Sequence, residues 1–221
     1  MSKQQSEKSQ ERLEKCDTDK YKHVLENGTT SEQYKMAECL ISGFGYSNKK
    51  ISLMAEKLYK TAADNGHVNA SYMIYTLYAM KNKQSGVKYL KFAAENGHKI
   101  AKRMLMRCYL YGDAICNKEY APQKAVEMLK EYVKTDDAIA YNLLAECYEF
   151  GKGTPIDLKM AKIFYNKETT KILRDYNIER VNMVMQERTN PSKKLRDEIV
   201  AKYKDIYQIV DNKLVFINKR L

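Results

Sequence analysis

Two histidines occur in the same short phrase of this sequence, and a histidine beside carboxylates could bind a metal or act as a base. AADNGH ends at His67 and AAENGH ends at His98. A metal site needs further ligands. No third histidine falls in register, since His23 lies upstream of the repeated segment. We therefore expect structural roles for His67 and His98, and we predict no metal site, no catalytic site and no cofactor.

Cysteine chemistry is the second candidate, and the five cysteines are Cys16, Cys39, Cys108, Cys116 and Cys147. They form no CxxC pair and no cluster of zinc spacing. Three of them share one position of the repeat described below, which predicts core thiols. Neighbouring helices lie about 8–10 Å apart, whereas a disulfide needs Cα atoms within roughly 7 Å. We therefore expect no disulfide between those three, and free thiols in a reducing compartment.

Two Gly-x-Gly segments could suggest phosphate binding, at Gly43 with Gly45 and at Gly151 with Gly153. Neither has the Lys-Ser/Thr of a P-loop or the preceding strand of a dinucleotide fold. We interpret both as turns. No set of acid, base and nucleophile is visible, so the sequence predicts a protein that is not an enzyme. A site assembled from distant residues would be invisible in sequence, which keeps an enzyme as the least favoured alternative.

The segments that flank the repeated phrase also align, which indicates a structural repeat. One column of the alignment holds Cys39, Leu77, Cys108 and Cys147. The alignment predicts four first helices that begin near residues 32, 70, 101 and 140. Apolar residues recur in them at helical spacing. In the fourth helix they are Ala140, Leu143, Leu144, Cys147 and Tyr148.

A second helix is predicted after each first helix. Pro122 suits the first turn of one of them, where its missing N–H costs nothing. Gly66 and Gly97 fall just after a helix, where a left-handed residue can close the last turn. The repeated phrase therefore marks the end of one helical hairpin.

This pattern resembles the Sel-1-like repeat, a helical hairpin related to the tetratricopeptide repeat. The tyrosine column of that repeat is filled by Tyr78, Tyr109 and Tyr148, and its Ala-Ala-x-x-Gly-His ending occurs twice. The resemblance covers roughly residues 30–170. It implies an all-α fold, an α-solenoid in which antiparallel helical hairpins form a right-handed superhelix, followed here by additional C-terminal helices. The fourth unit lacks the terminal glycine, which leaves room for its second helix to continue beyond residue 170.

We divide the chain into three parts from the extent of the repeat. Residues 1–17 are predicted to be disordered, residues 18–170 to form about four hairpins with an N-terminal cap helix over 19–26, and residues 171–221 to form a C-terminal helical capping region and tail. Helices are predicted over 171–188 and 193–210. The final NKLVFINKRL is compatible with a strand, a docking tail or a binding peptide, and the sequence does not choose between them.

The predicted function follows from the surface of the array. Helical repeats bind partners along extended concave faces. In the related tetratricopeptide architecture the first helix of each pair lines that face. Positions 3, 7 and 10 of each first helix share one side. The predicted partner-binding residues, at positions 3 and 7, are Tyr34, Glu38, Tyr72, Thr76, Arg103, Arg107, Asn142 and Glu146.

Exposed tyrosine and arginine suit recognition of a protein or peptide, although an ordinary solvated face is an equally weighted alternative. The sequence thus predicts a non-enzymatic scaffold or adaptor, and the resemblance implies a role in assembling complexes. The net charge of +11 supports a second hypothesis, a protein that binds nucleic acid or an acidic surface. Compositional bias of the source genome is the favoured explanation of that charge, because Lys far outnumbers Arg.

Location is predicted from what the sequence lacks. No apolar run reaches the roughly 18–20 residues of a membrane span. The polar N-terminus carries no secretory signal. We expect a cytoplasmic or nuclear protein that is not secreted.

Overall fold

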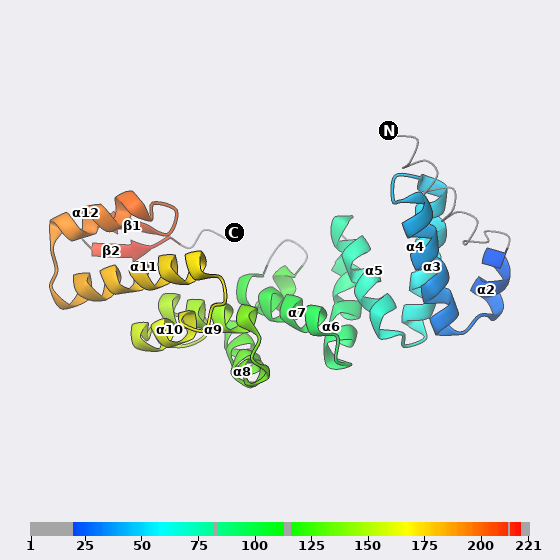
Figure 1. The fold of residues 1–221 in the computed structure, drawn as a ribbon, viewed down its shortest axis with the longest axis horizontal. Coiled ribbons are helices and arrows are strands. Elements are labelled where there is room, and N and C mark those ends of the chain that lie inside the picture. The colour runs from blue at the N-terminus through cyan, green and yellow to red at the C-terminus, as the bar shows by residue number, and fades with distance from the viewer. Residues whose placement is uncertain (1–19, 82–83, 113–115, 212, 218–221) are drawn as a thin grey trace. The chain divides into compact units, whose positions relative to one another are not determined.

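The computed structural model describes residues 20–81, 84–112, 116–211 and 213–217 (Figure 1). The segment 1–17, predicted to be disordered, lies outside these ranges. The chain forms two compact units, Met1–Leu105 and Met106–Leu221. The boundary falls inside α7 (Lys99–Tyr111), so this helix contributes residues to both units. The division at residue 170, which rests on the repeat pattern, stays a prediction.

The first unit consists of helical hairpins. α3 packs against α4, α4 against α5, and α5 against α6. The short helix α2 precedes them, at the place predicted for a cap helix, and contacts α3 and α4. The bounds are α2 (Tyr21–Asn27), α3 (Thr30–Phe44), α4 (Lys49–Asp64), α5 (Val68–Met80), the 3-10 turn η2 (Gln84–Gly86) and α6 (Val87–Glu95).

The second unit continues with two hairpins and then a different arrangement. Its elements are the end of α7, η3 (Asn117–Glu119), α8 (Pro122–Tyr132), η4 (Val133–Thr135), α9 (Ala138–Phe150), α10 (Leu158–Tyr165), α11 (Lys171–Thr189), α12 (Lys193–Lys202), β1 (Tyr207–Val210) and β2 (Lys213–Phe216). α8 and α10 each pack against α9, and α10 also packs against α11. The predicted helix over 171–188 is confirmed by α11.

Each first helix begins two residues before its predicted start. The predicted starts Ala70, Ala101 and Ala140 are the third residues of α5, α7 and α9. The backbone N–H of each donates a hydrogen bond to the side chain of the residue just before its helix. Hydrophobic periodicity begins only where a helix first touches the core, so it misses the capping turn.

Two predicted helix ends are wrong. α10 ends at Tyr165 and does not continue beyond residue 170, because the carboxylate of Glu168 accepts a hydrogen bond from the Thr170 N–H at 3.0 Å and the chain turns into α11. The helix predicted over 193–210 ends at Lys202. Residues 207–210 form β1 instead, which pairs antiparallel with β2 in a two-stranded sheet. Of the alternatives for the C-terminal segment, residues 213–216 form a strand.

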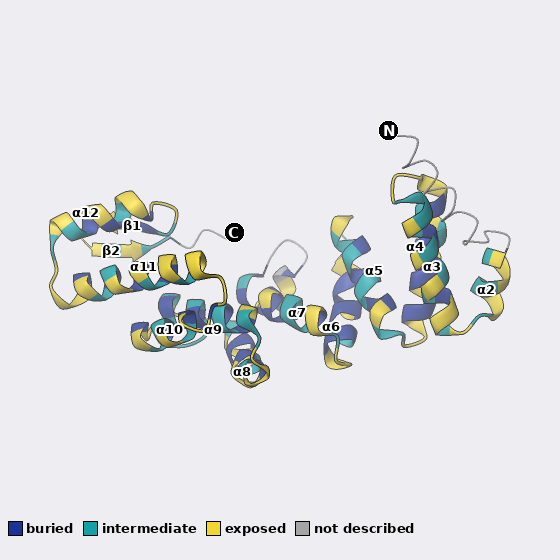
Figure 2. Ribbon diagram, in the orientation of Figure 1, coloured by how far each residue is buried: buried dark blue, intermediate teal, exposed yellow. Residues whose placement is uncertain are grey.

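The column of equivalent residues lies largely in the core. Leu77, Cys108 and Cys147 are buried, whereas Cys39 is half-buried. Position 10 of the first helices departs from the predicted polar face, since Leu110 and Glu149 are buried. Figure 2 shows that each helix of these hairpins has a buried side and an exposed side.

A disulfide joins Cys108 to Cys116, with Cα atoms 5.2 Å apart. The prediction of a free core thiol at Cys108 is therefore wrong, although its sulfur is buried as expected. The distance that argued against a disulfide applies only to two cysteines on neighbouring helices. The partner comes instead from the connection after α7, where Gly112 adopts a left-handed conformation (φ 55°) and lets the chain reverse direction.

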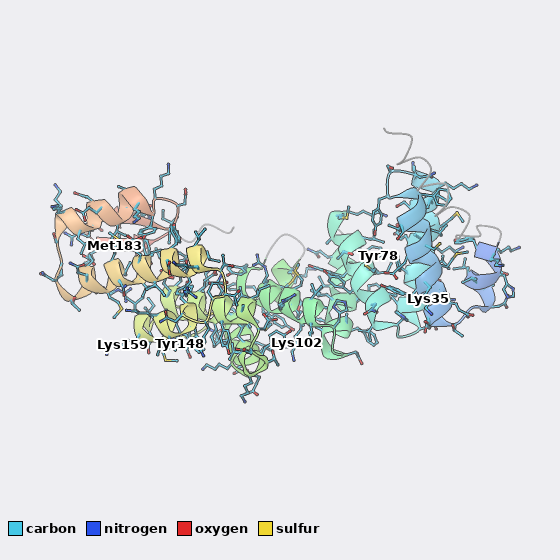
Figure 3. The ribbon with its side chains drawn as sticks, in the orientation of Figure 1. Lys35, Tyr78, Lys102, Tyr148, Lys159 and Met183 are labelled. Carbon is cyan, nitrogen blue, oxygen red and sulfur yellow. A yellow bond between two sulfur atoms is a disulfide. The ribbon has the colours of Figure 1, made fainter. Side chains whose placement is uncertain are left out.

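The C-terminal elements share a hydrophobic core with the last hairpin. Val181 and Val184 of α11, Ile199 of α12 and Tyr207 of β1 pack in one cluster with residues of α9 and α10. Tyr148 and Met183, both labelled in Figure 3, pack against this cluster. Among the described residues, no helix is both long and apolar enough to cross a membrane.

Candidate partner-binding site

His67 and His98 have the same role at two successive junctions. The Nδ1 atom of His67 accepts a hydrogen bond from the Ala70 N–H, and Nδ1 of His98 accepts one from the Ala101 N–H, both at 3.1 Å. Each imidazole thereby caps the helix that follows it. Burial lowers the pKa of both histidines.

Two predicted partner-binding tyrosines pack on these imidazoles. The rings of Tyr34 and His67 stack with centroids 4.6 Å apart, and those of Tyr72 and His98 stack at 4.4 Å. The Tyr34 hydroxyl donates to the carboxylate of Glu38, and burial together with this bond raises the pKa of Tyr34 to about 12. One side of each tyrosine ring is therefore occupied within the protein.

Two further predicted partner-binding residues of the first unit, Thr76 and Arg103, are only partly available to a partner. The Thr76 hydroxyl donates to the Met73 carbonyl at 2.7 Å, within its own helix. Arg103 is half-buried on α7. The structure thus brings together Tyr34 and Glu38.

In the second unit, three predicted residues converge. Arg107 of α7 with Asn142 and Glu146 of α9 line a pocket of about 220 Å³. Glu146 accepts a hydrogen bond from the Tyr111 hydroxyl, and Asn142 accepts one from the Asn177 side chain at 3.4 Å. Residues of the first helices α7 and α9 therefore line this pocket together with residues of the C-terminal region.

Lys152 is the residue of this pocket that sequence reasoning missed. Its Nζ atom lies 4.2 Å from the ring centroid of Tyr111 and within 6 Å of the centroids of Phe150 and Phe216, at 5.9 and 5.7 Å. Burial lowers the pKa of Lys152, and the nearby Glu146 carboxylate opposes this effect. The result is an ammonium group held among aromatic rings, an arrangement that stabilises a cation.

The only sequence signal for Lys152 was the Gly-x-Gly segment that contains it. The segment is a turn, as predicted, and one of its glycines is sterically required. A Cβ atom at Gly153 would lie 2.2 Å from the carbonyl oxygen of Pro122. The close approach of this turn to the start of α8 helps to hold Lys152 in the pocket.

Beneath the pocket, a buried ion pair joins α9 to the C-terminal region. The Arg180 guanidinium donates to both carboxylate oxygens of Glu149, at 2.8 and 2.7 Å. The hydroxyls of Tyr165 and Tyr207 donate to the same carboxylate at 2.7 and 2.9 Å. Burial and the adjacent negative charge of Glu149 raise the pKa of both tyrosines. Glu149 occupies position 10 of its helix, so periodicity placed it on the open face. The repeats could not indicate its burial, because its partners Arg180 and Tyr207 lie outside them.

A protein-family model described as Sel1 repeat matches residues 33–67, 70–98 and 138–167. Three segments of the chain are therefore similar to the Sel1 repeat. They coincide with the first, second and fourth predicted hairpins. The third hairpin, α7 with α8, lies outside the matched segments and contains both the disulfide and Arg107.

Two solved structures are similar to this chain. One is a Sel1 repeat protein from Oxalobacter formigenes, 23% identical, with a TM-score of 0.55 over 84% of this chain and 76% of that chain. The other is a protective antigen of uropathogenic Escherichia coli strains with an SLR fold, 18% identical, with a TM-score of 0.57 over 90% of this chain and 45% of that chain. This chain therefore spans less than half of the antigen's length. A search of curated proteins found no match.

These similarities confirm the predicted fold class, an all-α solenoid of helical hairpins, to which the β1–β2 hairpin is an addition. They do not extend to a partner. Within the part of the chain that the structure describes, no group of three His, Cys, Asp or Glu side chains could hold a metal ion. The pocket around Arg107 and Lys152 combines Sel1 repeat residues with residues from outside the matched segments.

Proposed function

We propose that this chain is a non-enzymatic scaffold that binds a protein or peptide partner through the first helices of its hairpins. The observation that carries the proposal is the convergence of Arg107, Asn142 and Glu146 on one pocket beside the aromatic-held Lys152. Arg107 is exposed, and arginine and aromatic residues are enriched where proteins bind one another.

The pocket offers a partner two kinds of contact. Arg107 and the ammonium of Lys152 supply positive charge, whereas Phe150, Phe216 and Ile217 supply apolar surface. A side chain that combines an apolar body with an acidic or amide end fits both. We therefore expect the partner to bind here through one protruding side chain rather than through a flat surface.

The test is affinity purification of the full chain followed by mass spectrometry, with two charge-reversal variants. We expect Arg107→Glu to lose the partner proteins by at least about tenfold, because reversal of a central charge opposes a complementary surface. Lys130→Glu is the matched control, since Lys130 is exposed on the second helix α8 of the same hairpin. It should recover the partner as the wild type does.

Equal recovery by a folded Arg107→Glu variant would contradict the proposed site. Nuclease treatment of the lysate addresses the nucleic-acid hypothesis. If the recovered proteins disappear after this treatment, they were held through RNA or DNA, and the protein-scaffold proposal fails.

A further inference from the structure

The β1–β2 sheet has an open edge on each side. Its strand order is β1–β2, so among the described residues each strand has a hydrogen-bonded neighbour on one side only. An open edge presents backbone N–H and C=O groups that can pair with a strand from another chain. In Figure 1, β2 lies on the side of β1 that faces α11. The open edge of β2 is therefore the edge of the sheet on the α11 side.

The register of the hairpin identifies the backbone groups that face outward. The Ile217 N–H donates to the Ile206 carbonyl at 2.8 Å, so these residues form a hydrogen-bonded pair. In an antiparallel ladder hydrogen-bonded and non-hydrogen-bonded pairs alternate. Leu214 opposite Ile209, and Phe216 opposite Tyr207, are then non-hydrogen-bonded pairs. Leu214 and Phe216 direct their N–H and C=O groups to the open edge of β2.

A cleft of about 760 Å³ follows this edge. It is lined by all four residues of β2, 213–216. Successive side chains of a strand point to opposite faces of a sheet. A cleft lined by four consecutive residues is therefore not confined to one face of the sheet and reaches the edge of the strand, and Tyr207 of β1 lines it as well. Val184 and Arg188 of α11 line the cleft together with Phe150 and Ile156.

The charges of the cleft are unbalanced. Its two carboxylates are already paired within the protein, Glu149 with Arg180 and Glu187 with Arg196. Arg188 and Lys213 are exposed, and among the described residues neither has an ion-pair partner. The cleft thus combines apolar walls with a cationic rim.

We propose that the open edge of β2 binds an extended segment of a partner protein in which apolar and acidic residues alternate. Such a segment would add a third strand, with backbone hydrogen bonds to Leu214 and Phe216. Its apolar side chains would occupy the cleft, and its carboxylates would lie near Arg188 and Lys213. A segment of four residues spans about 13 Å, the length of β2. Phe150 and Phe216 line both this cleft and the pocket around Arg107. Arg188 and Lys213 line only the cleft.

The probe is the acetylated and amidated peptide TVEVEVT with a fluorescent label, and binding to the full chain is measured by anisotropy. We expect saturable binding. The peptide TVKVKVT should bind at least about tenfold more weakly, because it repels the cationic rim. A peptide with N-methyl groups on alternate amides should also bind about fivefold to tenfold more weakly, because it cannot complete the strand hydrogen bonds.

Leu214→Pro removes an N–H that faces the open edge and leaves the ladder with β1 intact, as edge strands tolerate. Ile209→Pro is the matched control, because Ile209 is the cross-strand partner of Leu214 and its N–H faces the other edge. Binding should be lost in the first variant and retained in the second. Arg188→Glu/Lys213→Glu, which leaves the backbone unchanged, should weaken binding by at least about tenfold.

Equal binding of the acidic and basic peptides would overturn the proposal, as would unchanged binding by the charge-reversal variant. If the chain alone forms a dimer that Leu214→Pro dissociates, the occupant of the edge is a second copy, and the partner-peptide proposal is wrong. Arg107→Glu should leave peptide binding unchanged, so that failure of this inference and failure of the proposed scaffold site are distinguishable.

Discussion

A single side chain sets the start of each helix that follows a hairpin. His67, His98 and Asp137 occupy equivalent positions, and each accepts the N–H of the third residue of the next helix at 3.1 Å. An imidazole and a carboxylate thus perform the same task. They differ in one respect, because the histidine can accept this bond only while Nδ1 is unprotonated.

This difference predicts a pH effect on stability. Unfolded histidines bind protons below pH 6.5, and burial lowers the pKa of His67 and His98 in the folded chain. The unfolded state therefore binds more protons as the pH falls. The stabilising contribution is fully present above pH 6.5 and is lost as the pH falls through the folded pKa. We expect urea unfolding to show a lower free energy at pH 5.5 than at pH 7.5.

His67→Asp/His98→Asp should reduce this pH dependence, because an aspartate cap stays ionised over the same range. The variant also loses the stacking with Tyr34 and Tyr72, so the comparison concerns the slope with pH rather than the stability at pH 7.5. His23→Gln is the control, since His23 is exposed on α2. A slope equal to that of the wild type in the double Asp variant would refute the cap titration.

The candidate site was predictable from sequence only to the level of a helix face. Helical periodicity placed Arg107, Asn142 and Glu146 on one side, and these residues do share a pocket. Periodicity could not indicate that the Tyr34 ring stacks on His67, because Tyr34 lies in α3 and His67 caps α5. It also could not find Lys152, whose aromatic neighbours come from three separate elements.

At the scale of elements, the end of α12 shows how two periods compete. Tyr203, Ile206, Tyr207 and Val210 fit a helical spacing, which predicted one helix to residue 210. β1 ends at Val210 and β2 begins at Lys213, and Asp211, directly after β1, has a φ of 48°, which is typical of the tight turns that join two short strands. The strand Tyr207–Val210 forms because β2 returns beside it, a contact that a helical pattern does not encode.

The connection after α7 carries a second prediction. The Cys108–Cys116 disulfide closes a short loop and is buried. A cross-link of this length stabilises the folded state by about 2–3 kcal/mol. We expect dithiothreitol to lower the free energy of unfolding of the wild type by this amount. Cys116→Ala should already have the lower value and should not respond to dithiothreitol.

Cys39→Ala is the control for the disulfide, because Cys39 is a half-buried free thiol and its loss should leave the response to dithiothreitol intact. A wild type that does not respond would show that the bond does not form in solution. A disulfide that forms and stabilises the protein would argue against the predicted cytoplasmic location, because reducing compartments keep thiols reduced.

For the whole molecule, the repeat pattern and the folded units have different borders. The Sel1 match ends at residue 167, but the second compact unit runs from Met106 to Leu221 and includes the C-terminal helices and the β hairpin. Burial explains the difference. Glu149 lies in the last hairpin, and Arg180 and Tyr207, which bind its carboxylate, lie after residue 170. The sequence predicted a capping region there but could not indicate the hydrogen bonds that attach it to α9.

Removal of one partner of this pair should therefore destabilise the second unit as a whole. Arg180→Met leaves the Glu149 carboxylate buried without its countercharge, which costs about 3–5 kcal/mol. Glu149→Leu/Arg180→Met should recover part of this loss, because neither charge is then buried alone. Lys202→Met is the matched control. It breaks the exposed Lys202–Glu179 pair, also attached to α11, and should cost less than about 1 kcal/mol.

Chemical denaturation of the full chain measures the four free energies. If Arg180→Met costs no more than Lys202→Met, the buried pair does not hold the C-terminal region to the last hairpin. The expected large loss in Arg180→Met, with partial recovery in Glu149→Leu/Arg180→Met, would mean that residues 171–221 cannot be removed without destabilising the fourth hairpin. Residue 170 would then mark the end of a repeat pattern, and the folding unit would continue through β2.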